Sequence, residues 1–133
     1  MLKTIPNTTL KNMIQIDNTI KNPYDTNYIC LGSKHKGTYI HKSQIIYIEA
    51  YECYSWLHLS DGTKQLSCKS IGYYEESLHQ NNFVRIHRSY LINLFHLRSY
   101  EQKYRLIYLK GETVLSVSHR KNRLLSKMIH KQE

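Results

Sequence analysis

The chain has 133 residues, a hydrophobic fraction of 41% that includes twelve tyrosines, and a formal net charge of +9. This length allows one compact domain with its own core, plus a short extra segment. The sequence holds no apolar run approaching about 18 residues and no apolar N-terminal segment, which argues against a membrane span and a signal peptide. Its three cysteines include no C-x-x-C pair, which argues against a disulfide framework or a zinc knuckle. We therefore expect a cytoplasmic protein with reduced thiols.

The positive charge is concentrated in the second half of the chain. Residues 1–66 hold seven Lys/Arg against five Asp/Glu, and residues 67–133 hold twelve against five. All the arginines lie in the second half: Arg85, Arg88, Arg98, Arg105, Arg120 and Arg123. The planar guanidinium suits phosphate and guanine. The charge therefore leaves open a nucleic-acid surface, a merely solvated basic face, or a surface for anionic membrane.

The first 27 residues are polar and rich in Asn, Thr and Lys. Leu10, Met13 and Ile14 have the spacing of one helix face, which permits a short amphipathic helix begun by Thr8 or Thr9. We interpret residues 1–27 as an N-terminal extension that is either a linker or such a helix.

From Tyr28 onward, short β-branched and aromatic segments separated by turn residues predict strands. The predicted strands are Tyr28–Gly32, Thr38–His41, Ile45–Ala50, Tyr54–Ser60, Gln65–Cys68, Phe83–Ile86, Tyr90–Leu94, Tyr104–Leu109 and Thr113–Ser118. Asp61-Gly62 and Lys110-Gly111 are predicted hairpin turns.

Two segments have helical spacing instead. Ser70–Leu78 places Ile71, Tyr74 and Leu78 on one face, with Ser70 as its N-cap and Glu75-Glu76 expected on the solvated side. The second predicted helix runs from His119 to His130 with Ser118 as its N-cap. Its predicted apolar stripe consists of Leu124, Leu125, Met128 and Ile129. Eight to ten short strands with two helices make a mainly β single domain.

The start of the second helix is unusually basic, because His119, Arg120 and Lys121 form its first turn and Arg123 follows. Cations are disfavoured at a helix N-terminus by about 0.3–1 kcal/mol each. A phosphate docked there would meet both free N–H groups and these side chains. The alternative is a frayed helix end with solvated side chains.

The segment Phe83–Asn93 (FVRIHRSYLIN) is the second candidate site. Strict alternation would put Arg88 on the same face as the apolar Val84 and Ile86. We therefore expect the strand to break near His87 and to release Arg88 into a loop. Arg, His, Ser and Asn supply donors for phosphate oxygens and base edges, although an ordinary polar strand would carry the same residues.

These blocks resemble a known family. In order and spacing, IIYIEA at Ile45–Ala50, Asp61-Gly62, FVRIHRSYLIN at Phe83–Asn93 and SVSHRKNRLL at Ser116–Leu125 are similar to the LytTR domain, the DNA-binding output module of many bacterial response regulators. The resemblance implies a domain over residues 28–131. It also implies a mainly β fold, with about ten short strands in stacked antiparallel sheets, a small mid-chain helix and a C-terminal helix.

The resemblance also implies that loops bind double-stranded DNA in the major groove, often as pairs of domains on direct repeats, so we expect self-association or pairing on DNA. The first contact loop would be Tyr51–Ser55, the second would centre on Arg88, and the third would begin at Ser118. The DNA-binding residues carried over are Tyr54, Ser55, Arg85, His87, Arg88, Ser89, Asn93, Ser118, His119, Arg120 and Arg123. Whether His119 or Arg120 reaches a base stays open, since His119 stands where the family commonly has Arg.

No catalytic motif is present, and no pair of histidines at helical i, i+4 spacing has a third ligand nearby. We therefore expect no enzyme activity, no cofactor, no metal and no membrane partner. The first hypothesis is a sequence-specific transcription regulator. The second is a protein-interaction adaptor that keeps the fold without binding DNA, and an RNA-binding module is a third. Because 27 residues cannot form a receiver domain, we expect either a free-standing regulator or a fragment.

Overall fold

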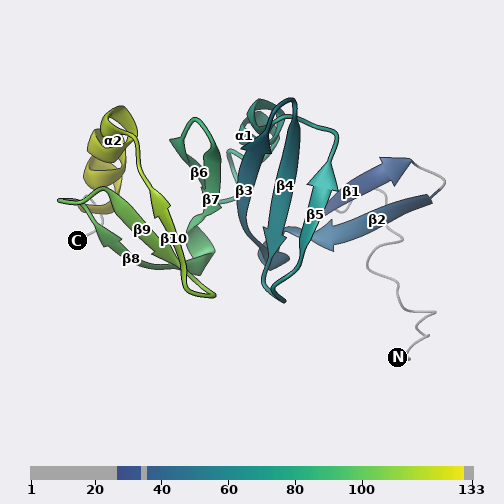
Figure 1. Cartoon of the computed structure of the whole chain (residues 1–133), viewed down its shortest axis with the longest axis horizontal. Helices are drawn as coiled ribbons and strands as arrows, with labels where there is room; N and C mark the ends of the chain where they lie inside the picture. Colours follow the sequence, from purple (N-terminus) through teal and green to yellow (C-terminus); the bar gives the residue numbers. More distant parts are fainter. Residues whose placement is uncertain (1–26, 34–35, 131–133) are drawn as a thin grey trace. The chain divides into compact units, whose positions relative to one another are not determined.

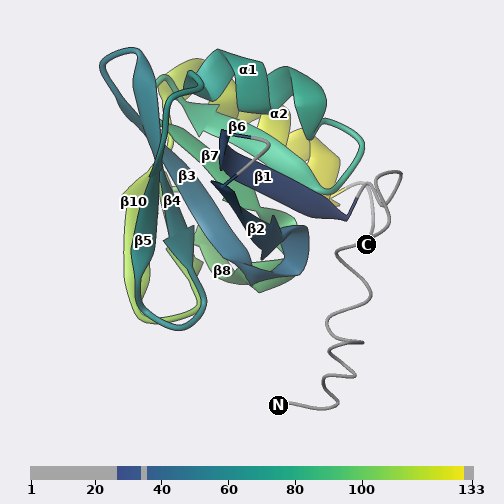
Figure 2. The same cartoon turned by 90° about the vertical axis from the view of Figure 1, so that its right-hand side faces the viewer.

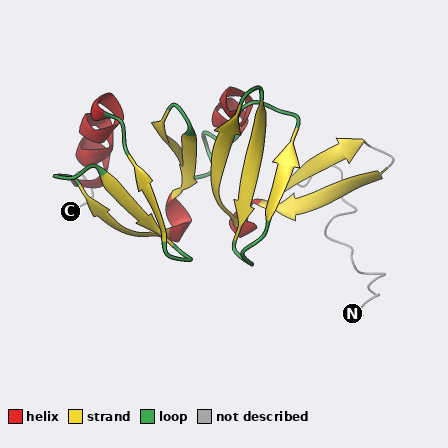
Figure 3. Cartoon of the chain, viewed as in Figure 1, coloured by secondary structure: helices red, strands yellow, loops and turns green. Residues whose placement is uncertain are grey.

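The computed structural model of the chain describes residues 27–33 and 36–130. It divides into two compact units, residues 1–42 and 43–133, which are described separately below (Figure 1). The predicted helix that would begin at Thr8 or Thr9 lies outside the described residues. Within the described ranges, ten strands form three antiparallel sheets, together with the helices α1 and α2. The mainly β fold class is therefore confirmed (Figure 3).

The first unit contains one hairpin. Strands β1 (Tyr28–Ser33) and β2 (Lys36–His41) pair antiparallel. Gly32 lies in this pairing with φ +96, and a Cβ there would come within 3.0 Å of the Lys36 carbonyl oxygen, so glycine is required. The 3-10 turn η2 (Lys42–Gln44) follows.

The second unit contains a five-stranded and a three-stranded sheet. The first has the order β5-β4-β3-β7-β6 and the second has the order β10-β9-β8. The bounds of the five strands are β3 Ile45–Tyr51, β4 Tyr54–Leu59, β5 Lys64–Ser67, β6 Phe83–His87 and β7 Tyr90–Asn93. Those of the three strands are β8 Leu97–Glu101, β9 Leu106–Leu109 and β10 Thr113–Ser116. The 3-10 turn η3 (Leu94–His96) joins β7 to β8.

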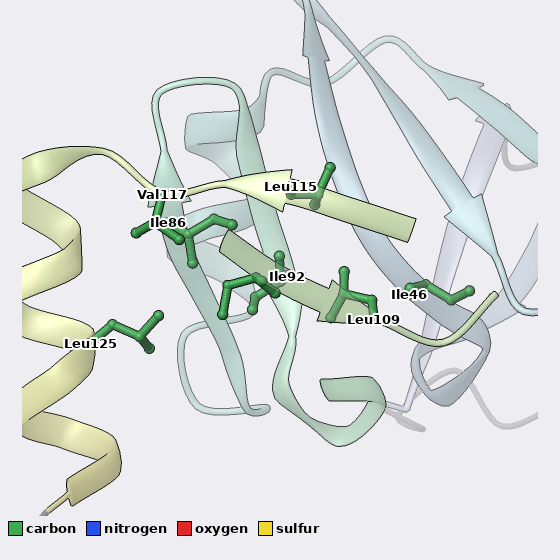
Figure 4. Packing of buried hydrophobic residues seen from close by; sticks show 8 residues of the cluster. Ile46, Ile86, Ile92, Leu109, Leu115, Val117 and Leu125 are labelled. Carbon is green, nitrogen blue, oxygen red and sulfur yellow. The ribbon is translucent and has the colours of Figure 1, made fainter. Parts of the chain in front are cut away.

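Aliphatic side chains from both sheets form a hydrophobic cluster in this unit (Figure 4). The buried members are Ile46, Ile86, Ile92, Ile107, Leu109, Leu115, Val117 and Leu125. Ile46 can join them because a bulge between Ile45 and Tyr47 interrupts the alternation of β3. Since Leu125 comes from α2, the same cluster also anchors the C-terminal helix.

The two helices flank β6. Helix α1 (Ile71–Ser77) contacts β3, β6 and β7, while α2 (His119–His130) contacts β6 (Figure 2). Ser70 caps α1 as predicted, since its side chain accepts a hydrogen bond from the Tyr73 N–H at 3.2 Å. Ile71, Tyr74 and Leu78 are buried, also as predicted. Neither helix is long and apolar enough to span a membrane.

Three expectations need correction. β8 was not predicted, because a bulge between Leu97 and Ser99 breaks its alternation. The predicted strand from Tyr104 starts at Leu106 instead, since residues 102–105 form a turn. The predicted apolar stripe of α2 is only partly buried. Leu125 is 2% exposed and Ile129 packs on the core, but Leu124 is 51% and Met128 37% exposed.

Candidate functional site

The turn between β6 and β7 presents Arg88 to solvent. β6 ends at His87, β7 begins at Tyr90, and the register shifts between Arg85 and His87. The predicted strand break near His87 is therefore confirmed. The Arg88 guanidinium makes no hydrogen bond or ion pair with any residue in the described part of the chain, and the residue is exposed. It is free to meet a ligand.

Arg85 is placed differently, because its guanidinium is used within the protein. Its Nη1 donates to the Glu75 Oε1 at 2.6 Å. Its Nε donates to the His87 carbonyl oxygen at 2.8 Å, and its Nη2 donates to the Arg88 carbonyl oxygen at 2.7 Å. Arg85 thus supports the turn that carries Arg88.

His87 and Ser89 complete the turn. The Ser89 N–H donates to His87 Nδ1 at 3.1 Å, so Nδ1 is an acceptor in this conformation. The Ser89 carbonyl oxygen accepts from the Ala50 N–H at 2.9 Å. Because Ala50 precedes the last residue of β3, this bond puts the β6–β7 turn beside the β3–β4 turn.

The predicted loop Tyr51–Ser55 is a tight hairpin turn. Tyr51 pairs with Tyr54, which leaves only Glu52 and Cys53 between the strands, and Glu52 has φ +55. The Tyr54 side chain is 40% exposed. Ser55 is fully buried and its Oγ donates to the Lys69 carbonyl oxygen at 2.8 Å. The Tyr54 side chain is therefore partly exposed to solvent, whereas the buried Ser55 side chain holds the backbone at Lys69.

The N-terminus of α2 lies at the same end of the unit. The Ser118 N–H donates to the Ile86 carbonyl oxygen at 2.9 Å, which ties the start of α2 to β6. Ser118 Oγ accepts from the Lys121 N–H at 3.3 Å, so the predicted N-cap is confirmed. His119, Arg120 and Arg123 are exposed, and the first turn of α2 contains no acidic residue. In Figure 1 the three turns lie together at the top of this unit.

One cavity of about 380 Å³ brings the second and third predicted loops together. Its lining residues are Glu75, Arg85, His87, Arg88, Ser118, Arg120 and Lys121. Tyr54, Ser55, Ser89, His119 and Arg123 do not line it. The cavity therefore joins five of the predicted site residues: Arg85, His87, Arg88, Ser118 and Arg120.

Asn93 lies away from this cavity, at the other end of β7, and is only 3% exposed. Its Nδ2 donates to the Ile45 carbonyl oxygen at 3.0 Å, and its Oδ1 accepts from the Phe95 N–H at 3.0 Å. Both polar atoms of the amide are thus used to join β3 to η3.

Sequence reasoning missed Glu75 and left Lys121 out of the site. The Glu75 side chain lies on the solvated side of α1 as expected, with 42% of it exposed, but its carboxylate also pairs with Arg85. The signal was present in the spacing, because Glu75 is four residues after Ile71 and three before Leu78, both of which are buried. A carboxylate beside this buried face can reach the neighbouring strand β6 while part of it stays in water.

Cations outnumber carboxylates around the cavity. Glu75 offsets Arg85, which leaves the charges of Arg88, Arg120 and Lys121 without a carboxylate partner among the described residues. The N-terminus of α2 adds partial positive charge. Within residues 27–33 and 36–130, no three His, Cys, Asp or Glu side chains gather as metal ligands. The chemistry offered is anion binding with directed hydrogen bonds.

A row of rings supports the turn from the sheet. The His58 ring stacks on Tyr47 with centroids 4.1 Å apart, Tyr47 lies 6.1 Å from Tyr90, and Tyr90 lies 5.4 Å from His87. His58 also bonds Glu49 at 2.8 Å. Burial, followed by the nearby Glu49 charge, raises the pKa of Tyr47 to about 12. The row thus links β4 to the end of β6.

Comparisons with known proteins agree with this geometry. The model of the LytTR family, described as the LytTr DNA-binding domain, matches residues 35–130. A similar solved structure is the LytTr DNA-binding domain of a protein described as a methyl-accepting/DNA response regulator from Bacillus cereus. It has a TM-score of 0.65 and 19% identity, over 77% of this chain and 96% of that one. At that identity the likeness shows a shared fold. No curated protein matches the chain.

Proposed function

Because the chain belongs to the LytTR family of DNA-binding domains, we propose that it is a transcription regulator that binds duplex DNA sequence-specifically through three neighbouring turns in the major groove. The observation that carries this proposal is the cavity that gathers Arg88, Arg120 and Lys121 around the N-terminus of α2. Recognition of DNA bases needs exposed, unpaired hydrogen-bond donors that are held on a rigid backbone. Arg88 meets that requirement.

The roles divide by geometry. Arg88 is the base-reading residue, because its guanidinium is exposed and can donate two parallel hydrogen bonds to guanine. Arg120 lines the cavity and His119 does not, which favours Arg120 as the second reader. Lys121 and Arg123 hold phosphates. Tyr54 contacts a base edge or a thymine methyl group from the neighbouring turn.

Arg85, His87, Ser89 and Ser118 position these readers. Ser89 and Ser118 each fix a turn to a neighbouring strand by a backbone bond of 2.9 Å. Two domains on direct repeats would double the contact surface, and we extend the proposal to pairing on such sites.

The test begins with selection of bound sequences from a random duplex pool. The selected duplex and a scrambled one are then titrated by fluorescence anisotropy at two salt concentrations. We expect binding that weakens steeply with salt and prefers the selected duplex by about 10³-fold or more. Absence of binding at low salt would refute the proposal and favour a protein-interaction adaptor. Binding with equal affinity for both duplexes would refute sequence specificity.

A further inference from the structure

We propose that Glu75 is a positioning residue for DNA recognition, whose carboxylate makes the short helix α1 part of the reading site. The inference rests on the proposed function of the β6–β7 turn. Glu75 does not touch the DNA in this proposal. It fixes Arg85, and Arg85 fixes the backbone on which Arg88 stands.

The geometry of Arg85 supports this role. Three nitrogen atoms of one planar guanidinium bond three different partners: Nη1 bonds the Glu75 carboxylate, while Nε and Nη2 bond the carbonyl oxygens of His87 and Arg88. A rigid fork that holds two successive carbonyls sets the orientation of the peptide between them. The Cα of Arg88 lies between these two carbonyl groups, so the bonds fix the backbone from which the Arg88 side chain projects.

The carboxylate is needed for two reasons. The two carbonyl groups alone would leave the guanidinium free to tilt, and they would offset only part of its positive charge. The Arg85 side chain is 17% exposed, so its charge is largely removed from water. A charge-assisted bond of 2.6 Å both offsets that charge and fixes the third corner of the plane. The lysine of an Arg85→Lys variant would keep the charge and could not bridge all three partners.

The turn is held from its other side as well. The Ala50 N–H bonds the Ser89 carbonyl oxygen at 2.9 Å, and the Ser89 N–H bonds His87 Nδ1 at 3.1 Å. The turn is therefore anchored to β3 on one side and to α1 on the other. Removal of Glu75 would release only the α1 side, which leaves a folded hairpin with a less defined position for Arg88.

Simple electrostatics predicts the opposite change in DNA affinity, so the direction of the measured change distinguishes the two explanations. Glu75 is a carboxylate in the wall of a cavity proposed to face phosphates. If it acted only through its charge, its neutralisation would tighten all DNA binding. Positioning predicts instead that neutralisation weakens binding to the selected duplex and spares, or tightens, binding to a scrambled one.

The chain supplies a matched control in Glu76. It is the next residue of α1, it is exposed, and its side chain has no hydrogen bond or ion pair with the residues that the structure describes. Glu75→Gln and Glu76→Gln make the same change of charge and shape within one turn of helix. Any difference between them reports the contact with Arg85.

The experiment measures both variants against both duplexes by anisotropy, with thermal unfolding as a check on folding. We expect Glu75→Gln to weaken binding to the selected duplex by about 10-fold, and Glu76→Gln to leave it within about 2-fold. Arg85→Lys should show a similar loss of preference, and the double variant Glu75→Gln/Arg85→Lys should lose little more than either change alone.

Two outcomes overturn the inference. If Glu75→Gln binds the selected duplex as tightly as Glu76→Gln does, or more tightly, Glu75 acts by charge or not at all. If the losses of Glu75→Gln and Arg85→Lys simply add, the two residues do not act as one device. In both cases the wild-type protein still prefers the selected duplex. A wild-type protein with no such preference would refute the proposed function itself, and the inference with it.

Discussion

The substitution Arg88→Ala tests base recognition, because it removes a side chain that the folded protein does not use. Arg88 is exposed and makes no hydrogen bond or ion pair with another described residue. Its truncation should therefore change the free energy of unfolding by no more than about 0.5 kcal/mol. The whole effect should appear in the complex with DNA. A bidentate arginine–guanine contact is worth about 1–3 kcal/mol, which corresponds to about 5- to 150-fold in Kd.

The assay is an anisotropy titration of wild type and variant with a selected and a scrambled duplex at several salt concentrations. Arg98→Ala is the matched control, since it also removes an exposed arginine, but from β8 beyond the far end of β7. Lys127→Ala, further along α2, should weaken binding slightly and equally for both duplexes. Arg88→Ala should weaken binding to the selected duplex far more than to the scrambled one. Equal loss on both would show that Arg88 contacts only phosphate, and that the base-reading role is wrong.

Three further substitutions test the framework of the site. Asn93→Ala should lower the free energy of unfolding by about 1–3 kcal/mol, because it leaves a buried carbonyl oxygen of Ile45 without a donor; chemical denaturation measures this, and an unchanged midpoint would contradict it. Leu125→Ala should cost about 2–5 kcal/mol by opening a cavity between α2 and the core, and a loss below that range would show that the helix closes over the gap. The pKa of Tyr47 is raised to about 12, so its neutral form stabilises the folded state fully below pH 10, and this contribution is lost as the pH rises from about 10 towards 12. Tyr47→Phe should therefore show a smaller loss of stability over that interval than wild type, as measured by urea denaturation at each pH; an identical loss would assign the alkaline effect to other tyrosines.

The sequence predicted those elements whose pattern is local. The bounds of α2 agree with the prediction from His119 to His130, because both the N-cap Ser118 and the periodicity lie within the segment itself. The hairpin turn at Asp61-Gly62 is also marked locally, since Gly62 has φ +90 and Asp61 Oδ1 accepts from the Thr63 N–H at 2.9 Å. Such signals need no knowledge of the rest of the chain.

Bulges explain why the sequence did not predict β8 or the different positions of Arg85 and His87. A single extra residue in a strand reverses the faces that alternation assigns to the residues after it. The bulge between Leu97 and Ser99 hid β8. The bulge between Arg85 and His87 has a larger consequence for the site. The family resemblance implied that both residues contact DNA, whereas the Arg85 side chain bonds the His87 backbone in the structure. The sequence could identify the segment, but it could not separate Arg88, whose side chain is free, from Arg85, whose side chain is bonded within the protein.

Buried and exposed polar groups have different roles in this unit, which explains how the site can be both basic and stable. Ser55 is fully buried and Asn93 nearly so, and each bonds a backbone carbonyl oxygen. Uncharged side chains can do this inside a sheet at little cost, whereas a buried unpaired cation would be expensive.

Arg88 therefore lies at the tip of a turn whose backbone is already held by hydrogen bonds, and Arg120 lies in the first turn of α2. Complex formation would then order mainly a few long side chains, at about 0.5–1.5 kcal/mol each, and would not order the loops that carry them. A turn held less firmly would add its own ordering cost to every binding event, which would lower affinity without changing a single base contact. In the proposed binding mode the Arg85–Glu75 pair uses one basic residue to hold the turn rigid, and the unpaired Arg88 contacts DNA.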